Sequence, residues 1–95
     1  MESERAETSS GDKPVRVREA NRRVTVGAAE SGVSAGVPLL CECSDPACGE
    51  LIVLTLVEVR HVRRDPARFV TLPEHRVEGA FAEFKTNHYW LHHRP

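Results

Sequence analysis

Residues 40–51 read LCECSDPACGEL and hold every cysteine of the chain, at positions 41, 43 and 48. Apolar residues flank this run on both sides, with Leu39 and Leu40 at its start and the run LIVL from residue 51 to residue 54 at its end. Two short apolar runs separated by a polar, turn-forming segment predict a β-hairpin. The sequence therefore predicts a strand pair with the segment CECSDPACGE, and all three thiols, at its tip.

The clustered thiols indicate a metal site, because disulfides are rare in a reducing compartment and the number of cysteines is odd. Zinc binds thiolates at about 2.3 Å in a tetrahedron. The first two cysteines would lie roughly 6.6 Å apart along a straight strand, so they can share one ion only if the backbone bends. Residues 44–46 (SDP) are turn formers and provide that bend. We therefore expect three ligands of a structural zinc ion: Cys41, Cys43 and Cys48.

A histidine is the natural fourth ligand, since three cysteines and one histidine form a common structural zinc site. His75 is the preferred candidate among the five histidines, because it follows a predicted strand and Pro73 in a short irregular segment. His93 and His92, near the C-terminus, are the alternatives, and a site without any histidine is another. The acidic neighbours of the cysteines are expected to form a solvated rim: Glu42, Asp45 and Glu50.

A helix is predicted directly after the hairpin. Residues 55–58 (TLVE) match the capping box, in which the side chains of Thr55 and Glu58 each accept from the other residue's backbone N–H. The helix is expected to run to about Arg64 and to end at Asp65-Pro66. Its buried stripe is expected to consist of Leu56, Val59 and Val62.

The C-terminal part is predicted to form a strand at residues 69–72 and a hairpin over residues 77–93, folded around a two-residue turn at Thr86-Asn87. Side chains that face each other across a strand pair share one side of the sheet. On this register the core face would carry Phe84, Tyr89, Ala82 and Leu91. The other face would expose two aromatic rings beside two histidines: Phe81, Trp90, His88 and His92.

The N-terminal part carries weaker signals. Residues 1–14 are rich in Glu, Ser and Gly and have no large apolar residue after Met1, which predicts a disordered tail. Residues 15–29 favour a short helix, and residues 30–38 are typical of a linker. With residues 39–95 as the zinc-binding part, we expect an α+β fold, a small zinc-stapled domain of short β-hairpins packed on one or two helices.

The run from residue 40 to residue 75 resembles a group of small uncharacterised proteins of actinobacteria and related high-GC bacteria. These carry a C-E-C-x-D-P-x-C segment, a strand, a T-L-x-E helix that ends in D-P, and an R-F-V strand that leads to a histidine. The present chain differs in residues 56–61, which lack the group's usual aromatic residue, and in P-E-H where the group has P-G-H. The resemblance implies no activity. It implies the ligands Cys41, Cys43, Cys48 and His75.

Composition narrows the class of protein. The chain has 95 residues, of which 40% are hydrophobic and 28% charged, and a formal net charge of -1. This length allows one domain, near the size at which a hydrophobic core alone gives only a few kcal/mol. Its longest apolar run, residues 51–57, is far shorter than the roughly 20 residues of a membrane span, and the acidic N-terminus is unlike a signal peptide. We expect a cytoplasmic protein without a membrane segment.

The expected function is a regulatory or adaptor module that contacts another protein through the exposed aromatic residues of the last hairpin. One alternative is nucleic-acid binding through an arginine cluster at the end of the helix, formed by Arg60, Arg63, Arg64 and Arg68. A second alternative is a thiol redox switch. An enzyme is not expected, because three thiolates and a histidine make a closed site, and a hydrolase would need a separate nucleophile, base and oxyanion hole.

Overall fold

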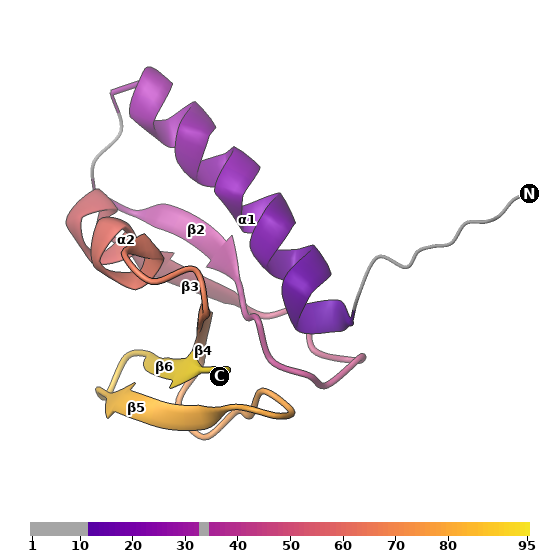
Figure 1. The fold of residues 1–95 in the computed structure, drawn as a ribbon. Helices are drawn as coiled ribbons and strands as arrows, with labels where there is room; N and C mark the ends of the chain where they lie inside the picture. The colour runs from indigo at the N-terminus through magenta and orange to yellow at the C-terminus, as the bar shows by residue number, and fades with distance from the viewer. Residues whose placement is uncertain (1–11, 33–34) are drawn as a thin grey trace, which may run out of the picture.

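The computed structural model describes residues 12–32 and 35–95 (Figure 1). The elements in chain order are α1 (Lys13–Glu30), β2 (Val37–Leu40), β3 (Leu51–Leu54), α2 (Leu56–Arg63), β4 (Arg68–Thr71), β5 (Phe81–Lys85) and β6 (Trp90–His93). β2 and β3 form a two-stranded antiparallel sheet, while β4, β6 and β5 form a three-stranded antiparallel sheet in that order. The predicted α+β class is confirmed.

The two-stranded sheet lies above the three-stranded sheet in the view of Figure 1, and both helices lie beside the two-stranded sheet. Helix α1 runs alongside β2, and α2 follows directly from β3. The three-stranded sheet lies on the other side of α2 from α1, and the C-terminus leaves from β6. The segment between β2 and β3, which carries the cysteines, extends beneath the first turn of α1.

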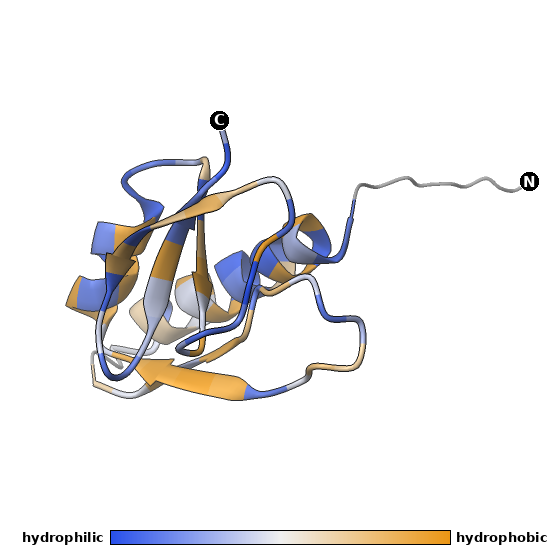
Figure 2. Cartoon of the chain, turned by 90° about the horizontal axis from the view of Figure 1, so that it is seen from below, coloured by the Kyte–Doolittle hydropathy of each residue, from blue (hydrophilic) through white to orange (hydrophobic). Residues whose placement is uncertain are grey.

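The predicted β2–β3 hairpin is present, and buried and exposed side chains alternate along each of its strands. Val37 pairs with Leu54 and Leu39 with Ile52, and all four side chains are almost completely buried. The outward-facing side chains are also apolar, so β3 is orange along its length in Figure 2. These exposed positions are Pro38, Leu40, Leu51 and Val53.

Helix α2 begins and packs as expected. The Thr55 hydroxyl accepts from the Glu58 N–H at 3.1 Å, and the Glu58 carboxylate accepts from the Thr55 N–H at 2.8 Å, which completes the capping box. The predicted stripe of Leu56, Val59 and Val62 is buried. It joins the hairpin strands and the three-stranded sheet in one core.

The N-terminal helix is longer than expected, and it begins earlier. Its N-cap is Asp12, whose carboxylate accepts from the Val15 N–H at 3.4 Å, and Pro14 occupies the first turn, where a missing N–H costs nothing. The C-cap is Ser31, and Gly32 follows with a φ of 77°. Of the predicted tail, residues 1–11 lie outside the described residues, as do residues 33–34 of the predicted linker. Val37 and Pro38 belong to β2 rather than to a linker.

The predicted register of the last hairpin is wrong. The loop has four residues, 86–89, rather than two, so Lys85 pairs with Trp90 and Phe84 with Leu91. The Thr86 hydroxyl explains the longer loop, because it accepts from the N–H groups of His88 at 3.1 Å and Tyr89 at 2.9 Å. An irregularity between Ala82 and Phe84 shifts the register once more.

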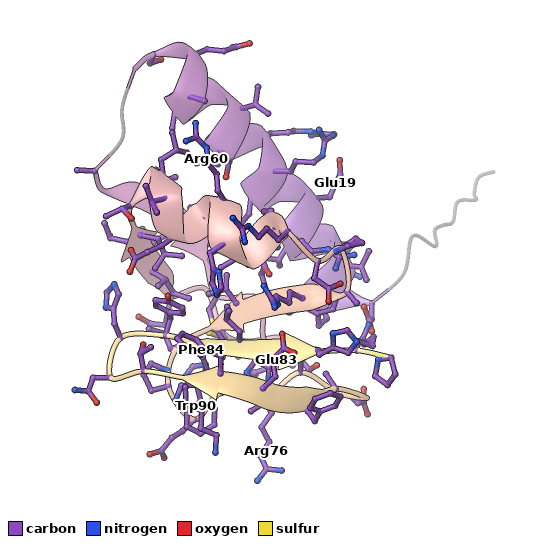
Figure 3. The ribbon with its side chains drawn as sticks, turned by 60° about the vertical axis from the view of Figure 1, so that its left-hand side comes forward. Glu19, Arg60, Arg76, Glu83, Phe84 and Trp90 are labelled. Carbon is purple, nitrogen blue, oxygen red and sulfur yellow. The ribbon has the colours of Figure 1, made fainter. Side chains whose placement is uncertain are left out.

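This register separates the aromatic side chains that were expected on one exposed face. Phe81 faces the same side as its partner His93, whereas Trp90 and His92 face the other side. Figure 3 shows Phe84 on the side of the sheet that faces α2 and Trp90 on the opposite side. His92 is buried rather than exposed, and Phe84, expected in the core, is 44% exposed. The predicted aromatic surface of Phe81, Trp90, His88 and His92 therefore does not form.

No helix within the described parts of the chain combines the length and apolar character of a membrane span.

Candidate metal centre

Four side chains with metal-binding atoms meet between the tip of the β2–β3 hairpin and the segment after β4. The sulfur atoms of Cys41, Cys43 and Cys48 and a ring nitrogen of His75 all lie within 4.8 Å of one another. His75 Nδ1 is 3.5 Å from Cys41 Sγ and 3.7 Å from Cys48 Sγ. A sulfur and a nitrogen bound to one tetrahedral zinc lie roughly 3.6 Å apart. The cluster could therefore hold a metal ion with little rearrangement.

The cysteine segment reaches this geometry through a bend after β2. The Cys41 N–H still donates to the Glu50 carbonyl at 2.9 Å, as a continuation of the hairpin ladder. The chain then turns, with the Cys48 N–H donating to the Asp45 carbonyl at 3.1 Å and the Asp45 carboxylate accepting from the Ala47 N–H at 2.9 Å. The bend expected from residues 44–46 is present, and it brings Cys48 back to the first two thiols.

A second short turn places the histidine. The His75 N–H donates to the Leu72 carbonyl at 3.1 Å, and Glu74 within this turn has a φ of 70°. A non-glycine residue with such a φ is strained by the contact of its Cβ with the backbone. The Ser44 N–H donates to the Arg76 carbonyl at 2.8 Å and ties the turn to the cysteine segment. The geometry at residue 74 suits the glycine of a P-G-H segment better than the glutamate of this chain.

The other histidines lie away from the cysteines. His92 is buried, with Nε2 2.9 Å from the Thr71 hydroxyl, and its burial lowers its pKa. His93 Nδ1 is 3.2 Å from an Asp65 carboxylate oxygen. His88 Nε2 is 2.6 Å from the Val53 carbonyl. Of the candidates considered from the sequence, His75 is therefore the one that the fold brings to the thiols, and the alternatives His92 and His93 are engaged elsewhere.

The thiols differ in their ease of ionisation. Cys41 and Cys43 are each 1% exposed, and burial raises the pKa of Cys41 to about 12, although the Leu72 N–H donates to its sulfur at 3.3 Å. Burial also opposes ionisation of Cys43. Hydrogen bonds from His75, from the backbone at Asp45 and from the neighbouring thiols outweigh it and lower the pKa of Cys43 to about 7. Because metals bind the thiolate form, binding at this site must release protons.

Glu42 does not belong to a solvated rim, and that prediction is wrong. In an extended segment neighbouring side chains point to opposite sides. Cys41 and Cys43 face the donor cluster, so Glu42, which lies between them in the sequence, points away from it. Its side chain is completely buried. One carboxylate oxygen accepts from Asn21 at 2.8 Å and from Arg63, and the other accepts from the Val70 N–H at 2.9 Å. Asp45 and Glu50, in contrast, are exposed as expected.

Asn21 of helix α1 is a second buried polar residue that the sequence did not reveal. It is 1% exposed, and its side-chain amide both donates to the Leu40 carbonyl and accepts from the Leu40 N–H, each at 2.8 Å. It thus pairs with the free edge of β2 as a neighbouring strand would. The only available signal was the asparagine itself, because a residue of low helix propensity within a helix needs a tertiary contact to explain it.

The four arginines predicted as a nucleic-acid surface do not act as one group. Arg63 is bound to Glu42, and Arg68 is paired with Glu83 at 2.6 Å. Arg60 on α2 and Arg64 at its C-cap are exposed. Two of the four guanidinium groups therefore hold elements of the fold together.

All three cysteines are free thiols. Comparison with protein-family models, with curated proteins and with solved structures gave no match to this chain. The resemblance to small actinobacterial proteins thus stays a prediction, and the donor cluster is the feature of this chain that points to a function. That cluster, with three sulfurs and one imidazole nitrogen in reach of one another, makes the chain a candidate metal-binding domain.

Proposed function

We propose that this chain is a small zinc protein in which Cys41, Cys43, Cys48 and His75 bind one structural Zn²⁺ ion. The observation that carries the proposal is the convergence of the four donor atoms within 4.8 Å. His75 lies 34 residues from Cys41 along the chain, so local structure alone cannot account for their proximity.

The donor set favours zinc over other divalent ions. Three soft thiolates and one imidazole in a tetrahedral arrangement match the preferences of zinc, whereas magnesium and calcium prefer oxygen ligands. Four protein ligands also leave no open coordination position for a water or a substrate. The site therefore supports a structural role, and we propose no catalytic activity.

The position of the site explains what the ion would do for the fold. Cys41 and Cys43 follow β2 of the two-stranded sheet, while His75 follows β4 of the three-stranded sheet. An ion bound to these residues joins the two sheets at one end of a small core. Because such a site does not exist in the unfolded chain, the free energy of metal binding would add to the free energy of folding.

Metal analysis and removal test the proposal. Protein purified without added metal is expected to contain about one zinc ion per chain, and a strong chelator is expected to abolish its native circular dichroism spectrum. Cys41→Ser and His75→Ala should lower the zinc content strongly. His93→Ala, which removes an imidazole away from the cluster, is the matched control and should keep it. Full loss of zinc in the control together with retention in His75→Ala would show that the wrong histidine has been assigned.

We further propose a cytoplasmic location, because free thiols that bind metal persist best in a reducing compartment.

A regulatory or adaptor role toward another protein stays a prediction, and the aromatic surface first expected for it does not form. Nucleic-acid binding has less support than the sequence suggested, since Arg63 and Arg68 are engaged within the fold. A gel-shift titration at low salt, where phosphate contacts are strongest, tests that alternative.

A further inference from the structure

Helix α1 is attached to the rest of the domain mainly through polar side chains. Its buried residues are Pro14 and Asn21, and Ala28 is its contribution to the edge of the core. Arg18 lies over the Phe69 ring, with its guanidinium carbon 4.3 Å from the ring centroid. A helix without a broad apolar face gains little from hydrophobic burial. Its docking therefore depends on what its polar residues touch.

Lys13, the first residue of this helix, reaches the metal centre. Its ammonium group donates to the Cys43 carbonyl at 3.1 Å and to the Asp45 carbonyl at 2.6 Å, and it lies 3.7 Å from the Cys43 sulfur. A lysine in the first turn opposes the helix dipole, which favours acidic residues there, and the first turn of α1 has no acidic residue. The position of Lys13 is thus explained by its contact with the cysteine segment rather than by helix stability.

The charge of the loaded site supplies the reason for this contact. One Zn²⁺ ion with three thiolates and a neutral imidazole carries a net charge of about -1. Cys41 and Cys43 are buried, so water can screen this charge only in part, and an adjacent cation stabilises it. The ammonium group of Lys13 would bring the sum of charges at the site to about zero.

We propose that Lys13 is the charge-balancing residue of the metal site, and that metal loading thereby fixes the first turn of α1 to the cysteine segment. This inference rests on the proposed zinc site. Zinc binding and the docking of α1 are then coupled, because an ion that gains affinity from the docked lysine must, by linkage, also favour the docked position of the helix.

The test compares three variants of the full chain: Lys13→Met, Lys13→Arg and Arg23→Met. The first keeps the length of the side chain without its charge, and the second restores a cation. The third removes one positive charge from an exposed position of the same helix and is the matched control. Zinc affinity is measured by competition with a chromophoric chelator, and docking by deuterium exchange of the α1 amides with and without zinc.

Lys13→Met is expected to bind one zinc ion per chain about ten-fold more weakly than wild type, the lower end of the effect of removing an outer partner of a metal ligand. Zinc should slow amide exchange in the first turns of α1 in wild type and in Arg23→Met, and much less in Lys13→Met. Lys13→Arg should recover most of both effects. If Lys13→Met folds poorly, Lys13→Arg still tests the role of the side chain, because it changes Lys13 while keeping a cation at that position.

Equal zinc affinity in Lys13→Met and Arg23→Met would overturn the role of Lys13 while leaving the zinc site intact. That role is also overturned if Lys13→Arg loses as much affinity as Lys13→Met, since charge would then not be the property that matters. Absence of zinc binding in the wild-type chain would instead remove the proposed function and this inference with it.

Discussion

Replacement of Glu42 by glutamine should destabilise the protein strongly without weakening metal binding at the proposed site. Glutamine keeps the shape of the side chain, so no cavity forms. It replaces one acceptor oxygen by an NH₂ group, which must face either the Val70 N–H or the donors of Asn21 and Arg63. In every orientation at least one buried donor meets another donor, and Arg63 loses its charged partner.

The magnitude follows from these contacts. A buried donor without an acceptor costs about 1–3 kcal/mol, and a hydrogen bond to a charged group contributes about 1.5–3 kcal/mol. The Arg63 side chain is 23% exposed and can regain part of its hydration, which favours the lower end of the sum. We expect a loss of about 3 kcal/mol in the free energy of unfolding. For a domain of this size this corresponds to a decrease in Tm of roughly 12–24 °C.

Urea unfolding in the presence of zinc, followed by circular dichroism, measures this change. Glu50→Gln, which alters an exposed carboxylate in the same segment, is the control and should stay within about 0.5 kcal/mol of wild type. Zinc content should stay at the wild-type level in both variants, because Glu42 points away from the cluster. A Glu42→Gln variant as stable as the Glu50→Gln control would refute the role assigned to the buried carboxylate.

Two further predictions concern the turn before His75 and the buried His92. Glu74→Gly should raise the free energy of unfolding by up to about 1 kcal/mol, since relief of the left-handed strain exceeds the entropy cost of a glycine. An unchanged or lower free energy of unfolding, measured in urea, would contradict this. Burial lowers the pKa of His92 in the folded protein. As the pH falls below about 6.5, the His92 ring is therefore protonated in the unfolded chain before it is protonated in the folded one, and the folded state loses stability. His92→Gln should therefore lose less stability than wild type between about pH 7.5 and pH 5.5 in the same assay, and an unchanged loss would show that His92 does not contribute.

The parts of the fold that the sequence predicted correctly depend on neighbours along the chain. The capping box at Thr55 and Glu58 needs only four consecutive residues, and the β2–β3 hairpin needs two apolar runs with a turn between them. The bend that gathers the cysteines likewise contains short-range hydrogen bonds, from the N–H groups of Ala47 and Cys48 to Asp45. Such features can be predicted because short-range contacts determine them.

The incorrect predictions involve contacts between distant segments, or side-chain contacts that change a loop. The last hairpin adopts a four-residue loop because the Thr86 hydroxyl satisfies two backbone N–H groups, and it shifts again at an irregularity in β5. Glu42 was expected in water because glutamate is rarely buried, and only the packing of Asn21, Arg63 and Val70 around it makes burial favourable.

The amino-acid sequence alone requires the three thiols to lie together, because eight consecutive residues with a turn at their centre cannot place them far apart. The same local patterns specify the two strands of the hairpin and the helix that follows it. The sequence favours His75 as the fourth donor but leaves His92 and His93 open, and it gives no sign of the lysine beside the thiols, so the three-dimensional packing decides both. His75 and the lysine lie more than 25 residues away along the chain, and their approach depends on how the two sheets and helix α1 pack, which no local pattern encodes.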